Sequence, residues 1–248
     1  MRLELKNVRQ SYGQKIIIDN LNLTFLPGIY GFMGPNGAGK STTIRMVCTV
    51  EEPVTGEIHY NGNNIYSMGK EYREKIGYVP QKAVMFNGTV NSNVCYGNNG
   101  KGDITKEKVK EAIKVAQAQE FVEKMDDKYE THIAQGGTNI SGGQKQRLAI
   151  ARAIARDPEI YIFDDSFSAL DYKTDSILRK ELKKYTKDAT SMIVAQRIGT
   201  IMNADKIVVL DKGKIVGLGT HKELLKTCDV YREIALSQLS KEELENAE

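Results

Sequence analysis

The sequence predicts an α/β fold: a core of mostly parallel strands, a small antiparallel β layer and an inserted α-helical subdomain. Short β-branched and aromatic runs alternate with helical patterns along the chain. Several runs are continuously apolar, which is typical of parallel strands covered on both faces. A mostly helical stretch, residues 84–155, interrupts this alternation. We therefore expect a single domain, 1–248, in which 1–83 and 156–248 form the core and 84–155 forms the helical subdomain.

The strand patterns come in two kinds. The early ones alternate and turn on Asn and Gly, which favours the antiparallel layer, whereas the later ones are more uniformly apolar. The expected strands are LELKNV (3–8), KIIIDNLNLTF (15–25), IYGFM (29–33), EIHYN (57–61), KIGYV (75–79), IYIF (160–163), SMIVA (191–195), KIVVL (206–210) and KIVGLG (214–219).

Two helices are indicated by apolar stripes with helical spacing. The first covers 106–118, and its stripe consists of Val109, Ala112, Ile113 and Ala116. The second covers 142–156, with Ser141 as its N-cap and a stripe of Leu148, Ala151, Ile154 and Ala155.

Composition excludes several classes of protein. The net charge is only +3 with both signs mixed along the chain, which argues against a nucleic-acid protein held by a basic stripe. The three cysteines are scattered and favour a reducing compartment. No signal peptide and no stretch of ~20 apolar residues is present, so we expect a cytoplasmic chain without direct membrane insertion. The acidic tail, 240–248, is expected to fray. His59, His132 and His221 lack ligand spacing and are predicted to be surface or turn residues.

The segment GPNGAGKST lies between an apolar strand and a helical stretch. It matches G-x-x-x-x-G-K-[ST], in which glycines let successive N–H groups face one phosphate and the helix dipole adds positive charge. Lys40 supplies an ammonium for the β- and γ-phosphates, and the Ser41 hydroxyl is a magnesium ligand. The alternative is an ordinary glycine-rich turn. The candidate phosphate-binding residues are Gly34, Pro35, Asn36, Gly37, Ala38, Gly39, Lys40, Ser41 and Thr42.

The segment IYIFDDSFSALD, residues 160–171, ends an apolar strand in two adjacent carboxylates. In proteins with such a phosphate loop, the acid at the end of a neighbouring strand holds the magnesium shell, and Asp164 fits that role. Strand-end polar residues can also cap the next helix, and Ser166 or Asp171 is a candidate for that function.

The segment NISGGQKQRLAIARAIARDP, residues 139–158, with SALD just beyond it, resembles the nucleotide-binding domain of ATP-binding cassette (ABC) transporters. The resemblance covers essentially the whole chain and implies a P-loop NTPase (RecA-like) core. It implies that Tyr12 stacks on adenine, although Tyr12 could instead be a strand-edge core residue. Gln81 would complete the magnesium shell and couple the site to a membrane partner. The implied γ-phosphate clamp on the opposing subunit consists of Ser141, Gly142, Gly143 and Gln144, with Ser168 to Asp171 crossing the dimer interface beside them.

Two residues depart from the family pattern. Asp165 stands where the family usually has Glu, which polarises the attacking water, and Gln196 stands where it usually has His. Asp is shorter by one methylene, about 1.5 Å, and a misplacement of about 1 Å can cost a hundredfold in rate. Both changes occur in the hydrolysis-impaired halves of heterodimeric drug exporters. The alternative is neutral drift, with Asp165 acting through an extra water. We expect a site that binds ATP and Mg²⁺ well and turns over slowly.

The resemblance implies a transport ATPase that works with a second cassette, in a homo- or heterodimer formed on ATP binding, and with a transmembrane domain at the inner face of the membrane. The main alternative is a nucleotide-gated dimerisation module with little hydrolysis. A soluble cassette acting on nucleic acid or ribosomes is disfavoured, because tandem cassettes and a long coiled coil are absent.

The two parts of the sequence resemble different subfamilies. Residues 1 to about 78 resemble stand-alone ATPase subunits, and the rest resembles an exporter cassette. One hypothesis is a chimera joined near YVPQ, which would have no transport role by itself; a natural mosaic is the alternative.

Overall fold

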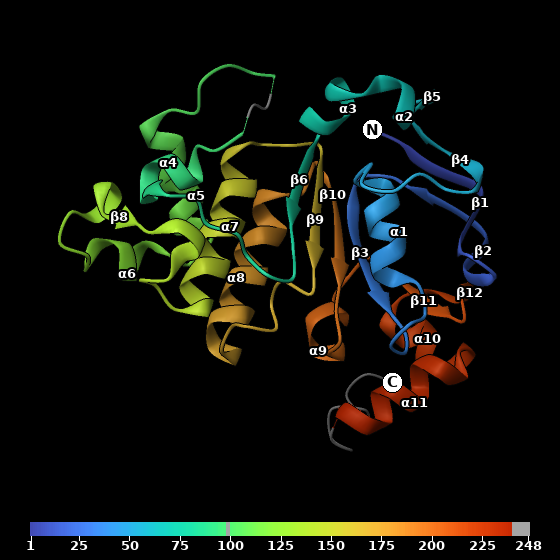
Figure 1. The fold of residues 1–248 in the computed structure, drawn as a ribbon. Helices are drawn as coiled ribbons and strands as arrows, with labels where there is room; N and C mark the ends of the chain where they lie inside the picture. Colours follow the sequence, from blue (N-terminus) through green and yellow to red (C-terminus); the bar gives the residue numbers. More distant parts are fainter. Residues whose placement is uncertain (98–99, 240–248) are drawn as a thin grey trace. The chain divides into compact units, whose positions relative to one another are not determined.

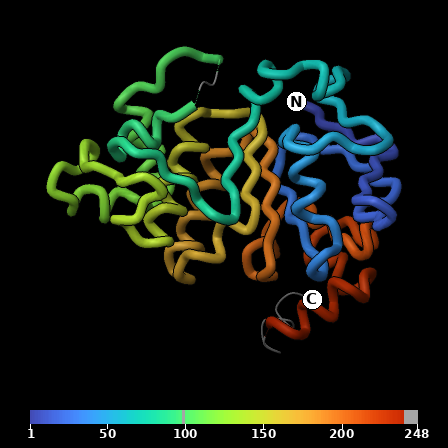
Figure 2. Tube along the Cα trace, viewed as in Figure 1, coloured from blue at the N-terminus to red at the C-terminus, as the bar shows by residue number. Residues whose placement is uncertain are grey.

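A computed structural model describes residues 1–97 and 100–239, so the tail predicted to fray lies outside the described residues. The chain divides into two compact units: the first combines residues 1–73 with the segment from residue 188 onward, and the second is residues 74–187. In the first unit, strands from the beginning of the chain and helices from its end belong to one body, drawn in blue and red in Figures 1 and 2. The predicted subdomain boundaries at 84 and 155 remain a prediction.

The first unit contains an antiparallel sheet in the order β2-β1-β4-β5. β1 extends to Tyr12 instead of ending at residue 8 as predicted, because it keeps pairing with β2 until Tyr12 lies opposite Lys15. Leu3 and Leu5 of β1 are buried, and so are Val8 and Gln10 after a register shift between Leu5 and Val8, so one face of the strand is covered on each side of the irregularity. The strands are β1 (Leu3–Tyr12), β2 (Lys15–Phe25), β4 (Thr55–Tyr60) and β5 (Asn63–Asn64).

The first unit also contains strands in the order β12-β11-β3-β10. β3 pairs in parallel with both β10 and β11, and β12 is antiparallel to β11. Their bounds are β3 (Gly28–Met33), β10 (Thr190–Val194), β11 (Lys206–Asp211) and β12 (Lys214–Gly219). The helices are α1 (Lys40–Val47), α2 (Ile65–Met68), α3 (Lys70–Glu74), α9 (Ile198–Ile201), α10 (His221–Thr227) and α11 (Asp229–Gln238). α3 ends on the first residue of the second unit.

In the second unit, β6 and β9 pair in parallel, and β9 is buried at every position. β7 and β8 form a short antiparallel pair. The strands are β6 (Ile76–Val79), β7 (Gly88–Thr89), β8 (His132–Ile133) and β9 (Ile160–Asp164). The helices are α4 (Val90–Val94), α5 (Lys106–Val115), α6 (Gln119–Glu123), η1 (Lys128–Glu130), η2 (Gln135–Gly137), α7 (Gly142–Ala155) and α8 (Tyr172–Tyr185).

α5 and α7 lie side by side (Figure 1) and bury the two apolar stripes predicted from the sequence. α5 ends at Val115 instead of residue 118, because Gln117 has a φ of 55° and the left-handed conformation stops a helix. The predicted α/β class is confirmed, and Ser141 is the N-cap of α7 as predicted.

One histidine differs from the prediction. His221 is buried, with 5% of its surface exposed, and its Nδ1 lies 2.7 Å from the Tyr231 hydroxyl. Its position at the first residue of α10 turns the ring toward α11. A lone polar residue after a turn gave no sign of this packing.

Candidate nucleotide-binding site

The predicted phosphate loop connects β3 to α1 in the first unit. Gly34, Gly37 and Gly39 have φ values of 144°, 80° and 102°, a region that L side chains rarely adopt. A Cβ on Gly34 would lie 2.0 Å from the Leu210 carbonyl oxygen, and one on Gly39 would lie 2.4 Å from Ile18 Cδ1. The loop therefore needs glycine both for its backbone conformation and for close packing.

Lys40 begins the helix that follows this loop. Its Nζ donates hydrogen bonds to the carbonyl oxygens of Gly34 at 2.6 Å and Pro35 at 2.8 Å, so the ammonium is turned back into the loop. Gly39 is the N-cap of α1 and no side chain caps the helix. The positive end of the helix dipole and a fixed cation therefore converge on one short turn, the arrangement that binds phosphate.

Tyr12 lies at the end of β1 with half of its surface exposed. Its hydroxyl donates to Glu51 Oε2 at 2.6 Å, and Glu51 Oε1 is 2.8 Å from Arg45 of α1. The bond to Glu51 raises the pKa of Tyr12, so the phenol is neutral at physiological pH. The aromatic ring is held on the surface beside the helix that follows the phosphate loop, and the structure does not bury it in the core.

Gln196 follows β10, which pairs in parallel with β3 in such a register that Val194 lies opposite Phe32. The phosphate loop begins directly after β3. Because carboxyl ends of neighbouring parallel strands meet at one edge of a sheet, Gln196 and the phosphate loop leave the same edge of this unit.

The two acids lie at the end of β9 in the second unit, where Phe163 pairs with Val79 of β6. Asp164 and Asp165 are 9% and 8% exposed. Gln81 Nε2 donates to Asp165 Oδ2 at 3.0 Å, and the Tyr78 hydroxyl lies 3.4 Å from Asp164 Oδ2. Of the residues predicted to hold magnesium or to act on the attacking water, Gln81, Asp164 and Asp165 lie together at the carboxyl ends of β6 and β9.

The backbone of Asp165 has a φ of 49°, a left-handed conformation that Asp tolerates better than most side chains. Ser168 secures this turn, because its hydroxyl donates to the Asp165 carbonyl at 2.8 Å. Ser166 does not cap a helix: its hydroxyl donates to the Val79 carbonyl at 2.7 Å, which ties the turn to β6.

The start of α7 carries the motif predicted to clamp a second nucleotide. Ser141 Oγ accepts from Gln144 N at 3.3 Å, and Gln144 Oε1 accepts from Ser141 N at 2.8 Å, a reciprocal capping box. A Cβ on Gly143 would lie 3.4 Å from the Ala169 carbonyl oxygen, so the motif and the segment after Asp165 are in close contact.

Asp171 caps α8, as one of the sequence interpretations allowed. Its Oδ1 accepts from Thr174 N at 2.9 Å, and that bond lowers the pKa of the Asp171 carboxyl. The carboxylate therefore remains charged at neutral pH. A capping role is compatible with a second role at an interface, since a carboxylate has lone pairs for several donors.

A half-buried arginine that sequence reasoning missed connects α7 to α4 and to the segment before α4. Arg152 donates to the Asn93 carbonyl at 2.7 Å and the Val84 carbonyl at 2.9 Å. Its guanidinium lies 5.1 Å from the Phe86 ring centroid and 5.8 Å from that of Tyr96. Burial lowers the pKa of Arg152 to about 10, so it is charged at neutral pH. An arginine on the flank of an apolar stripe was the available signal.

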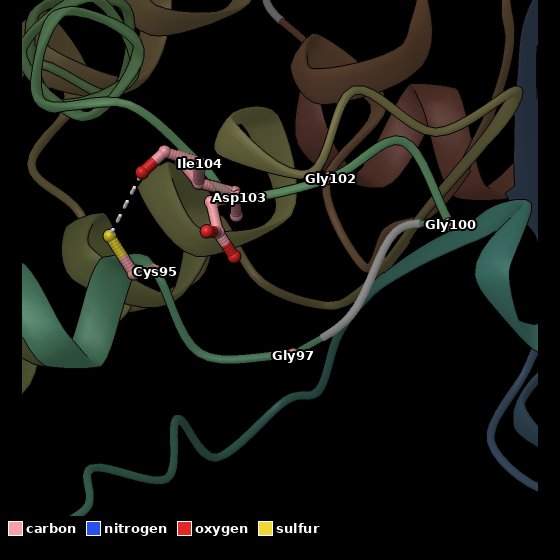
Figure 3. Close-up of a pocket in the computed structure, with 6 residues that line it drawn as sticks. All are labelled: Cys95, Gly97, Gly100, Gly102, Asp103 and Ile104. Atoms are coloured by element: carbon pink, nitrogen blue, oxygen red, sulfur yellow. Dashed lines mark hydrogen bonds between the residues drawn. The ribbon is translucent and has the colours of Figure 1, made fainter.

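A pocket of about 440 Å³ in the second unit has no counterpart among the predicted site residues (Figure 3). Its lining consists of Cys95, Gly97, Gly100, Gly102, Asp103 and Ile104. The Cys95 thiol faces the Ile104 carbonyl at a sulfur–oxygen distance of 3.9 Å. Burial raises the pKa of this thiol, so it is protonated and a poor nucleophile at neutral pH.

Among residues 1–97 and 100–239, no helix is long and apolar enough to cross a membrane. No group of three or more His, Cys, Asp or Glu side chains there could hold a metal ion. A magnesium site made by one carboxylate, one hydroxyl and one amide does not require such a group, because Mg²⁺ takes much of its shell from water and phosphate.

The glycine loop, the lysine at the start of α1 and the parallel strands define a phosphate-loop nucleotide-binding protein. The family model described as ABC transporter matches residues 18–168, and the chain belongs to that family as an ATP-binding cassette.

Relatives align along almost the whole chain. An uncharacterized ABC transporter ATP-binding protein of Mycobacterium tuberculosis is 42% identical over 228 residues, 90% of this chain and 38% of the relative. P-glycoprotein 14 of Caenorhabditis elegans is 37% identical over 252 residues, 100% of this chain and 19% of the relative. The chain thus spans well under half the length of these relatives. Alignments that run through both halves give no support to a chimera joined near YVPQ.

A solved structure supports the same assignment. The structure of a bacterial Atm1-family ABC exporter with ATP bound matches with a TM-score of 0.91 and 31% identity, over 97% of this chain and 42% of the exporter chain.

Proposed function

We propose that the chain binds Mg-ATP at residues 34–42 and acts as a slow ATPase cassette of a transporter. The observation that carries this proposal is the loop between β3 and α1. Its glycines adopt backbone conformations that other residues rarely take, the helix that follows has no side-chain cap, and the Lys40 ammonium is bonded to the loop's carbonyl groups. The exposed ring of Tyr12, beside the same helix, suits stacking on adenine.

Magnesium would be held by Ser41, Gln81 and Asp164. All three offer oxygen, the donor that Mg²⁺ prefers. The bond from Gln81 Nε2 to Asp165 leaves the amide oxygen of Gln81 as the ligand. When bound, the ion would neutralise charge on the β- and γ-phosphates. The role of this chain's residues is to orient the triphosphate against Asp165.

Asp165 and Gln196 would carry out hydrolysis slowly. Asp165 is fixed by the Gln81 amide and by a turn that buries its carboxylate. A rigidly held acid that is one methylene short cannot easily move forward to polarise a water. The same feature supports a second candidate function, in which ATP binding closes a dimer and hydrolysis contributes little.

The nucleotide would be shared with a second cassette. Ser141 to Gln144 would face the γ-phosphate bound by the opposing subunit, beside Ser168 to Asp171, and the contact between Gly143 and Ala169 supports a joint surface. The chain would work in the cytoplasm at the inner face of a membrane, bound to a transmembrane domain, as the exporter with ATP bound suggests.

Steady-state phosphate release from the chain and from an Asp165→Glu, Gln196→His double variant tests the proposal. We expect a gain of about tenfold or more in the variant, because the restored methylene corrects a misplacement of over 1 Å. Lys40→Ala in both backgrounds is the matched control and should abolish binding of a fluorescent ATP analogue. Equal rates with intact binding would favour the dimerisation module, and unchanged binding by the Lys40→Ala variants would contradict the site.

A further inference from the structure

The segment that carries Gln196 is a short exposed turn between β10 and α9. Gln196 and Arg197 are exposed, whereas Ile198 is fully buried. Arg197 is the N-cap of α9 and makes no capping bond with its side chain. Arginine cannot do so, because its guanidinium has no acceptor. The start of α9 therefore depends on another residue for an acceptor.

That residue is Gln238, on the last turn of α11. Its Oε1 accepts from Ile198 N at 2.8 Å, and its Nε2 donates to the Gln196 carbonyl at 2.8 Å. One side-chain amide thus forms hydrogen bonds with both peptide groups that flank Arg197. We name this pair of bonds the Gln238 clamp.

Gln238 is the last residue of α11 and lies on the face by which this helix packs. Tyr231 and Ala235 are completely buried, and with Gln238 they recur at i, i+4 and i+7, which places them on one helix face. The Tyr231 hydroxyl contacts the His221 ring at 2.7 Å, which fixes α11 against α10. The buried face of α11 therefore fixes the position of Gln238, and the two bonds of Gln238 fix the turn that contains Gln196 and Arg197.

We infer that Gln238 is a positioning residue for Gln196: it holds the backbone of the turn so that the Gln196 side chain meets the γ-phosphate. This inference rests on the proposed function. The clamp bond to the Gln196 carbonyl is exposed and the one from Ile198 N is partly buried. The buried residues of β10 and α9 do not depend on either bond. Loss of the clamp should therefore loosen the turn while leaving the fold intact.

Hydrogen exchange tests the structural part independently of ATP. In Gln238→Ala the amide of Ile198 should exchange about three- to tenfold faster, the factor that one net hydrogen bond supplies. Leu236→Ala is the matched control, because Leu236 lies on the same helix with 60% of its surface exposed. The control should exchange as the unchanged chain does. Equal exchange in the two variants would overturn the clamp.

Kinetics test the functional part in the Asp165→Glu background, which restores the longer acid and keeps Gln196. Adding Gln238→Ala should lower kcat about three- to tenfold with KM for ATP unchanged, whereas Leu236→Ala should change neither. Gln238→Glu should lower kcat less than Gln238→Ala does, because a carboxylate still accepts from Ile198 N but cannot donate to the carbonyl of residue 196.

A double-mutant cycle separates positioning from general damage. With Ala at position 196, Gln238→Ala should have no further effect on kcat, since no side chain remains to be positioned. If Gln238→Ala lowered kcat by the same factor with Ala at position 196, the inference would be overturned. Absence of turnover in every variant would instead refute the proposed function, and the positioning role would fall with it even where exchange confirmed the clamp.

Discussion

Gly34 shows how one residue joins the phosphate loop to the sheet. With a φ of 144° and a Cβ position only 2.0 Å from the Leu210 carbonyl, it cannot carry a side chain without moving β11. The contact is with backbone, which cannot turn aside as a flexible side chain would. This residue therefore links the geometry of the anion site to the stability of the unit.

We expect Gly34→Ala to lower the free energy of unfolding by about 2–5 kcal/mol, from backbone strain and overpacking together. Gly62→Ala is the control, because Gly62 has a φ of 88° but no atom within 4 Å of the Cβ position. It should cost about 1 kcal/mol, from strain alone. Urea denaturation measures both losses of stability. Equal losses would show that the Leu210 carbonyl moves away from the added methyl group at little cost in free energy.

α10 and α11 form an element pair whose contact contains a titratable group. His221 is buried against Tyr231, and its Nε2 has no hydrogen-bond partner within the described part of the chain. Burial, followed by the nearby charge of Lys222, lowers the pKa of His221. The folded protein therefore holds this imidazole neutral where an unfolded chain would protonate it.

The pH dependence follows from that difference. Below about pH 6.5 the imidazole of His221 binds a proton in the unfolded chain but not yet in the folded chain. The stabilisation is complete above pH 6.5 and is lost as the pH falls through that value toward the lower folded pKa. We expect the urea concentration at the unfolding midpoint to decrease when the pH is lowered from 7 to 5.5. The decrease should be smaller in His221→Asn, whose side chain cannot titrate. Parallel curves for the two proteins would contradict this assignment.

At the scale of the whole molecule, the proposed function predicts association that depends on nucleotide. With Mg-ATP the mass measured by light scattering should rise toward about twice the monomer value at high protein concentration, by mass action. Mg-ADP should not produce this rise, because it lacks the γ-phosphate that Ser141 to Gln144 would meet. Lys40→Ala should remain monomeric with either nucleotide, and a rise in that variant would separate association from the phosphate loop.

Local patterns predicted much of this molecule. The phosphate loop, the two helical stripes and the Ser141 cap depend on neighbours within a few residues, so their residue patterns are visible in the sequence. The magnesium role of Gln81 beside Asp164 came only from the family resemblance, and the structure shows the parallel pairing of β6 with β9 that brings their two segments together.

The remaining contacts join distant positions and leave no local trace. Arg152 reaches a carbonyl 59 positions away, and the Gln238 clamp spans 40 positions. A single polar residue on a helix is ordinarily solvated, so neither residue stands out from its neighbours. The burial of His221 escaped prediction for the same reason, since it depends on the packing of α11.

The Gln238 clamp also bears on how the chain can be shortened or fused. Cleavage after Leu239 would keep the amide that spans Arg197, whereas cleavage after Ile234 would remove it together with the last turn of α11. A tag or fluorescent protein joined at the earlier position would therefore alter turnover from a distance, and the change could be mistaken for an effect of the fused partner.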